Sequence, residues 1–306
     1  MNASEVIAAV SPETDEETVF PWRLVEEVLD ILQERDVRFF RYCDLHFEKS
    51  WCGSRLRYLD EYIKFRSARR GAAAAVEALG SYAGLRWGHR FPTLRRLVVE
   101  RSRGLPPPAV VLQHDADLLP EKTVAMMNLE RRRGVRSSNY FFVRHASEKA
   151  YGLDVPVLQA LEREGFEIGY HQNAFERASY KVHDALKLAA EDLQWLRGRF
   201  SIRSFVPHGG EASRDGRNNE HLPHAGELKT LLWAYNGKCI LKDYTWSDGG
   251  IKKHVPQDPR EFAKGLVQGS RAMLLMHPQY YGCRLRSDWD SLPISGSPWW
   301  RKLWGL

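Results

Sequence analysis

Acidic side chains follow an apolar segment near the middle of this sequence. The segment Val110–Gln113 runs directly into Asp115 and Asp117. If this segment is a β-strand, both carboxylates point to the same side, because side chains alternate along a strand. Two neighbouring carboxylates repel each other, so a bound cation or a shared proton would stabilise them. A structural interpretation is also open, in which Asp117 caps a following helix and Asp115 accepts a bond from loop backbone.

Further along the chain, similar apolar segments also end in titratable residues. His171 and His208 each follow such a segment, and later segments lead into Asp248 and His277. An imidazole at the end of a strand is a good ligand for zinc or iron, although a single histidine is more often structural. Five segment ends of this kind are hard to explain by packing. The sequence therefore predicts one site built from several of them.

The elements that must position these residues follow Pro106–Pro108, where short apolar strands begin to alternate with amphipathic helices. The predicted strands are Ala109–Gln113, Ser138–Val143, Phe166–Tyr170, Ser204–Val206, Cys239–Leu241 and Ala272–Met276. The predicted helices are Pro120–Arg133, Val155–Glu164, Tyr180–Arg197 and Pro259–Gln268. This alternation is typical of parallel strands in an α/β layer or barrel. In both architectures, sites form where the strands end.

The remaining regions flank this α/β unit. Residues 1–20 are acidic and are expected to form a flexible tail, and residues 21–105 a helix-rich extension. Within that extension, the helical spacing of apolar residues predicts a helix over Trp22–Glu34. The segment Val37–Cys43 that follows is predicted to be a strand. We expect this strand to join the main sheet, because an isolated strand cannot satisfy its own backbone. The α/β barrel is expected over residues 106–285, and residues 286–306 form an aromatic and basic tail.

Composition excludes several classes of protein. The chain has 306 residues, 43% of them hydrophobic, which excludes a disordered chain. A net charge of +6 is too small and too dispersed to predict a nucleic-acid partner. The four cysteines form no C-x-x-C pair, so we expect reduced thiols. No apolar run reaches the length of a membrane span and the first residues lack a signal-peptide pattern, so we expect a cytoplasmic protein.

Taken together, the motifs resemble those of the polysaccharide deacetylase (NodB-homology) family of metal-dependent carbohydrate esterases. The corresponding segments are His114–Asp117, Gly169–His171, Arg203–Gly209, Tyr244–Asp248 and Leu275–His277. The sequence is most similar to a divergent subgroup with H-D-x-D, E-I-G-x-H and S-D-x-G-G motifs, associated with bacterial surface-polysaccharide loci. Ser247–Gly250 is one residue short of the last motif. The resemblance covers about residues 109–281 and implies a deformed parallel (β/α) barrel with fewer than eight strands.

The resemblance also implies roles for individual residues. Asp115 corresponds to the catalytic base that activates water, and His277 to the general acid that protonates the departing amine. Asp117 and His171 correspond to ligands of one divalent metal ion, zinc or a similar first-row ion. The implied reaction is the removal of an acyl group, N-acetyl in particular, from a carbohydrate substrate such as a sugar or a glycan precursor.

One position departs from the family pattern. The family has a second histidine four residues after the first, and Phe175 occupies that position here. We expect His208 to supply the third ligand because it ends the neighbouring strand, with Asn173 and Glu176 as alternatives. His114 is a further competitor for the metal, although its side chain should point away from the two aspartates.

Substrate contacts are expected from residues beside these motifs. Tyr170 and Trp246 offer rings that can stack on a sugar, and Asn173 and Asp248 offer polar groups. Two alternatives to carbohydrate deacetylation remain. One is hydrolysis of a non-sugar C–N bond on the same fold, and the other is an inactive relative that binds carbohydrate or protein.

Overall fold

The computed structural model describes residues 20–45, 107–144, 152–210, 212–234, 244–249 and 258–282. One parallel sheet contains every strand of these residues, and it curls into a half-barrel. Its strands are β1 (Arg38–Phe40), β2 (Ala109–Ala116), β3 (Ser138–Phe141), β4 (Glu167–Gln172), β5 (Ser204–Pro207), β6 (Leu232–Trp233), β7 (Tyr244–Ser247) and β8 (Arg271–Met276). The order across the sheet is β6-β5-β4-β3-β2-β8-β7, and β1 also pairs with β2.

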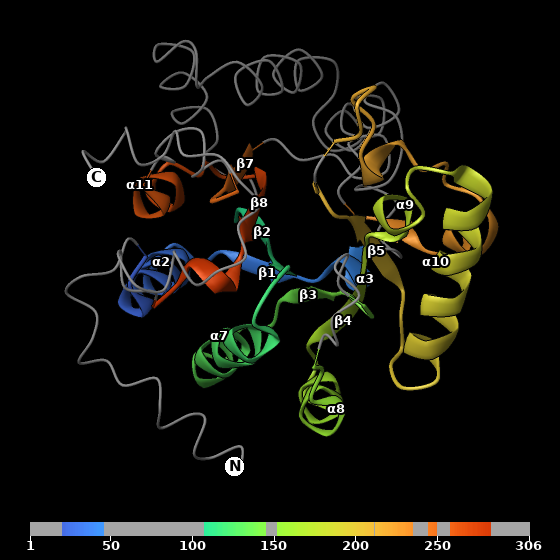
Figure 1. The fold of residues 1–306 in the computed structure, drawn as a ribbon. Helices are drawn as coiled ribbons and strands as arrows, with labels where there is room; N and C mark the ends of the chain where they lie inside the picture. The colour runs from blue at the N-terminus through green and yellow to red at the C-terminus, as the bar shows by residue number, and fades with distance from the viewer. Residues whose placement is uncertain are drawn as a thin grey trace, which may run out of the picture.

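Helices surround the curled sheet (Figure 1). The α-helices are α2 (Trp22–Glu34), α3 (Tyr42–Leu45), α7 (Pro120–Arg132), α8 (Val155–Arg163), α9 (Ala174–Arg177), α10 (Val182–Arg197) and α11 (Pro259–Lys264). Three short 3-10 helices are η2 (Asn219–His221), η3 (Gly226–Thr230) and η4 (Pro278–Tyr280). The predicted α/β class with parallel strands is therefore confirmed.

The N-terminal strand, β1, pairs with the first part of one edge of β2. Residues 38–40 of β1 pair with 109–111 of β2, whereas β3 pairs with 113–116. The two short strands thus divide the same edge of β2 between them, and β8 pairs with the opposite edge. The prediction that this strand joins the sheet is confirmed, and its backbone groups are satisfied there.

Alternating side chains build separate apolar layers on the two faces of the sheet. From β2, Val110 and Leu112 pack in an outer cluster with residues of α2 and β8. Val111 packs instead in an inner cluster with Tyr140 and Met273. Because helices cover the outer face, strands such as β2 are buried along their whole length and appear in the sequence as nearly continuous apolar runs.

The strand count of the barrel region agrees with the expectation of fewer than eight. The described part of residues 106–285 contains seven strands, β2 to β8, and β1 from the N-terminal extension brings the described sheet to eight. The apolar pattern did not predict β6 and β7. Those two strands are too short or too exposed to produce an apolar run. The predicted strand Cys239–Leu241 lies outside the described residues. None of the helices described is long and apolar enough for a bilayer crossing.

Candidate metal centre

Asp117 lies where β2 turns into α7. The chain makes this turn through Leu119, whose φ of 51° is in the left-handed region that non-glycine residues seldom adopt. Leu119 is the N-cap of α7, and no side chain caps this end of the helix. The structural interpretation of Asp117 as a helix cap is therefore wrong. Its carboxylate instead faces the ends of the neighbouring strands.

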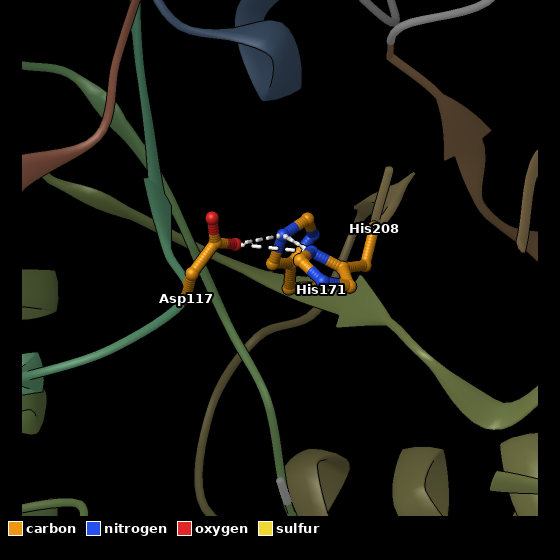
Figure 2. Close-up of side chains that lie close together, drawn as sticks. All are labelled: Asp117, His171 and His208. Carbon is orange, nitrogen blue, oxygen red and sulfur yellow. Dashed lines mark hydrogen bonds and ion pairs between the residues drawn. The ribbon is translucent and has the colours of Figure 1, made fainter. Parts of the chain in front are cut away.

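Two imidazoles meet the carboxylate of Asp117 at this end of the sheet (Figure 2). The Nε2 atom of His171, on β4, is 2.8 Å from Asp117 Oδ1. The Nδ1 atom of His208, which follows β5, is 3.1 Å from the same oxygen. The two imidazole nitrogens are 3.3 Å apart. Three residues from three strand ends therefore point one ligand atom each at a common centre.

Contacts with groups other than Asp117 fix the orientation of the His171 and His208 rings. The Nδ1 atom of His171 lies 3.2 Å from the carbonyl oxygen of Val206. A carbonyl can only accept, so Nδ1 donates this bond, and Nε2 is the ring nitrogen that is left to face Asp117 or a metal ion. Phe142 stacks on His171, with ring centroids 4.7 Å apart and ring planes 7° apart, and its ring lies edge-on to His208 at 5.0 Å. The contact between His171 Nδ1 and the backbone carbonyl of Val206 is typical of a metal-binding histidine.

The charges of the three groups are coupled. Burial alone would raise the pKa of Asp117, but the charge of His208 and the hydrogen bonds from His171 and His208 hold this pKa well below its usual value. Burial likewise opposes protonation of His208, but the negative charge of Asp117 outweighs it and raises the pKa of His208. Asp117 is therefore a carboxylate at neutral pH.

The donor set fits a divalent metal ion. Nitrogen and oxygen ligands at about 2.1 Å from a tetrahedral zinc ion are about 3.4 Å apart. The observed separations of 2.8 to 3.3 Å are slightly below that value. One carboxylate and two imidazoles are also the ligand types of first-row metals in hydrolytic sites. The structure therefore brings together the three residues predicted as metal ligands.

The alternative third ligands have other hydrogen-bond partners. The amide of Asn173 is fully buried and donates to the backbone oxygen of Arg144. Glu176 accepts from the side chain of Asn219 at 3.4 Å and does not belong to the cluster. Phe175, at the position of the family's second histidine, is buried beside Tyr180. This geometry favours His208 as the third ligand.

A second histidine and aspartate pair lies beside the cluster. The Nδ1 atom of His277 is 2.5 Å from Asp248 Oδ1, and the backbone N–H of His277 donates to Asp248 Oδ2 at 2.8 Å. Burial opposes protonation of His277, but Asp248 outweighs it, and the pKa of His277 rises to about 10. The other ring nitrogen, Nε2, lies 3.8 Å from Asp117 Oδ2. Asp248 therefore holds His277 in one orientation, with Nε2 toward the cluster.

Asp115 lies within electrostatic reach of the same groups. Its carboxylate contributes to the raised pKa of both His208 and His277. The Nε2 atom of Gln113 donates to Asp115 Oδ1 at 2.8 Å. His114, between these residues, points the other way and contacts Glu130 at 2.7 Å in the outer layer. The period of two along β2 thus separates His114 from the acids, as predicted.

The predicted substrate contacts need correction. Tyr170 is fully buried, and its hydroxyl donates to Asp192 at 2.8 Å. Trp246 packs in the outer apolar cluster with Leu274. Neither ring is available to a sugar, since both belong to packed layers outside the half-barrel. Asn173 is buried against backbone and Asp248 against His277, so these two side chains hold the structure around the cluster.

Sequence reasoning missed two residues that contact the cluster. Phe142 follows β3 and stacks on His171, and Gln279 in η4 donates to Asp117 Oδ2 at 3.2 Å. The sequence signal for each was its position. Phe142 ends an apolar strand beside the strand of His171, and Gln279 comes two residues after His277.

The fold and the cluster define an α/β half-barrel protein with a candidate metal centre at the C-terminal ends of its strands. No family model matches this chain, and neither does any curated protein or solved structure with which it was compared.

Proposed function

We propose that this protein is a metal-dependent hydrolase that removes an N-acetyl group from a sugar or a glycan precursor. The observation that supports this most is the position of Asp117, His171 and His208 at one end of a parallel sheet, beside the paired His277 and Asp248. Ligands, acid and base at one strand-end site are what metal-assisted hydrolysis requires.

The three clustered residues would hold the metal. Asp117 provides a carboxylate oxygen, and His171 and His208 provide one imidazole nitrogen each. Three protein ligands leave a coordination position for water or substrate, as in catalytic rather than structural zinc sites. When bound, a divalent ion supplies a Lewis acid that lowers the pKa of water and polarises the amide carbonyl.

The proton transfers are assigned to Asp115 and His277. Asp115 takes a proton from the attacking water while the water oxygen forms a bond to the acyl carbon. His277 gives a proton to the nitrogen as the C–N bond breaks, so that acetate and a free amine leave. Asp248 holds His277 through two hydrogen bonds, which keeps Nε2 directed toward the cluster. The carbohydrate part of the proposal rests on the motif resemblance.

The test combines metal analysis with an assay for acetate release. Purified full-length protein, stripped and then reloaded with Zn²⁺, is analysed for bound metal by mass spectrometry. It is then assayed on N-acetylated sugars, nucleotide sugars and cyclic amides. Asp117→Ala is the test variant, and Asp184→Ala is the matched control because Asp184 is exposed on α10.

We expect about one ion per chain in the wild type and in Asp184→Ala, and none in Asp117→Ala. Acetate should appear only with the metal-loaded proteins. Stoichiometric metal in Asp117→Ala would overturn the proposed site. Turnover of cyclic amides alone would replace the sugar substrate with a non-sugar C–N bond, and metal binding with no turnover of any compound would indicate an inactive relative.

A further inference from the structure

The two oxygens of Asp117 have different partners. Oδ1 faces the ligand nitrogens of His171 and His208 at 2.8 and 3.1 Å. Oδ2 faces away from them and accepts a hydrogen bond from Gln279 Nε2 at 3.2 Å. The Nε2 atom of His277 lies 3.8 Å from Oδ2, which is beyond hydrogen-bonding distance. One oxygen therefore faces the metal position and the other is held by an amide.

Gln279 is itself held in place by the elements around Asp117. It lies in η4, which packs against both β2 and α7. These are the two elements that Asp117 connects. The side chain is only 1% exposed, so it cannot leave its position without local unfolding. A buried amide on a packed element is a fixed donor rather than a mobile surface group.

We propose that Gln279 is a positioning residue, which sets the direction of the Asp117 carboxylate toward the metal. This inference rests on the proposed metal site. Asp117 follows the end of β2, and rotation about its two side-chain bonds would turn Oδ1 away from the imidazoles. The hydrogen bond to Oδ2 restricts that rotation. Hydrogen-bond partners behind metal ligands commonly account for a 10- to 100-fold difference in metal affinity.

The chemistry of an amide suits this task. An amide donor is neutral, so it orients the carboxylate without neutralising the negative charge that attracts a cation. A lysine or arginine at the same position would compete with the metal for that charge. Gln279 also lies two residues after His277, so η4 places the donor to Asp117 beside the proposed acid.

The experiment compares metal affinities of full-length variants. Gln279→Met keeps the size of the side chain and removes the donor, and Gln279→Asn keeps the amide but shortens its reach. Gln159→Met is the matched control, since Gln159 on α8 is half-buried and donates to the backbone of Arg199, in a solvent-exposed hydrogen bond. Zn²⁺ affinity is measured by competition with a chelator, and the visible spectrum of bound Co²⁺ reports ligand geometry. Melting temperatures are measured with the metal chelated.

We expect Gln279→Met to bind Zn²⁺ about 10- to 100-fold more weakly than the wild type, with an altered Co²⁺ spectrum. Gln279→Asn should fall between the two and provides the test if the methionine variant does not fold. If Gln279 served only in the packing of η4, its substitution would change the melting temperature measured with the metal chelated. The Zn²⁺ affinity and the Co²⁺ spectrum would then stay unchanged. That result would overturn the role of Gln279 alone. Failure of the wild type to bind metal would overturn this role together with the proposed site.

Discussion

Two carboxylates at opposite ends of the same sheet have very different surroundings. Glu167, at the start of β4, accepts hydrogen bonds from the hydroxyls of Ser138 and Ser204 at 2.5 and 2.6 Å and from the backbone N–H of Cys43 at 3.0 Å. Asp117, beyond the end of β2, faces two imidazole nitrogens that can each present a lone pair. Glu167 meets only hydroxyl and backbone N–H donors, whereas the imidazole nitrogens beside Asp117 can each either donate a proton or offer a lone pair.

The comparison shows that burial alone does not identify a functional carboxylate. Glu167 is satisfied by fixed donors, and this network joins α3 to three strands of the sheet. At Asp117, three electron-pair donors lie within 3.3 Å of one another, and they need positive charge between them. A proton or a metal ion can supply it. The type of partner, rather than the depth of burial, distinguishes the structural carboxylate Glu167 from Asp117 in the proposed site.

A single strand connects the two ends. Along β4, residues 167, 169 and 171 point to the inner side of the sheet, at the period of two that a strand imposes. Glu167 belongs to the network, Gly169 makes room for the ring of Tyr140, and His171 belongs to the metal cluster. Substitutions along this strand should therefore separate stability from metal chemistry.

The largest effect is expected from Asp115→Asn. Loss of a general base should lower turnover by about 10²- to 10⁴-fold, and Zn²⁺ affinity should stay near that of the wild type. The measurement is acetate release by the zinc-loaded protein, with Asp184→Asn on the surface of α10 as control. Unchanged turnover in Asp115→Asn would remove this residue from the mechanism.

A large loss of stability is expected from Gly169→Ala. The added methyl carbon would lie 2.3 Å from Cε1 of Tyr140, so the ring or the strand must move. Overpacking of this kind costs about 1–3 kcal/mol in the free energy of unfolding. The control is Gly198→Ala after α10, where a new methyl group would meet backbone oxygens at 3.6 Å. Equal stability of the two variants in denaturant titrations would contradict this account of Gly169.

A smaller and selective effect is expected from Phe142→Leu. The stack on His171 contributes about 0.5–1.5 kcal/mol beyond burial, so its loss should weaken Zn²⁺ binding by up to about tenfold. Phe166→Leu is the control, because Phe166 is equally buried but packs in a separate apolar cluster with Tyr170 and Phe205, where Arg136 lies over its ring. Competition titrations should show weaker metal binding in the first variant only.

The smallest effect concerns the pH dependence of stability at the other end of the sheet. Burial raises the pKa of Glu167 despite its three hydrogen bonds. Folding therefore favours the neutral acid, and the stability that Glu167 contributes falls as the pH rises from its usual pKa through its raised pKa. Glu167→Gln cannot titrate, so the loss of unfolding free energy in this variant should be larger at pH 4 than at pH 7.

The control for this measurement is Glu164→Gln, at the exposed end of α8. The difference in unfolding free energy between this variant and the wild type should not narrow toward neutral pH in the same way. A pH-independent difference for Glu167→Gln would show that Glu167 has an ordinary pKa in the folded protein.

Much of the fold followed from local patterns that are visible in the sequence. The strand predicted at Ser204–Val206 is β5, with one more residue at its end, and the helix predicted at Trp22–Glu34 is α2 with the same limits. These elements are buried on one or both faces, so their apolar spacing is strong. In contrast, β6 has two residues and β7 is partly exposed, and neither leaves a comparable pattern.

The sequence by itself determined which side chains meet at the strand ends. Parallel strands bring their C-terminal ends to one edge, so Asp117, His171 and His208 converge once each strand is recognised. Strand period also explains the error at Tyr170, because the residue next to His171 must point to the opposite face. Only the tertiary structure decided the contacts that hold the cluster. Phe142 and Gln279 lie 29 and 162 positions from the residues they contact, and no local pattern links such distant positions before the sheet has curled and η4 has packed against β2.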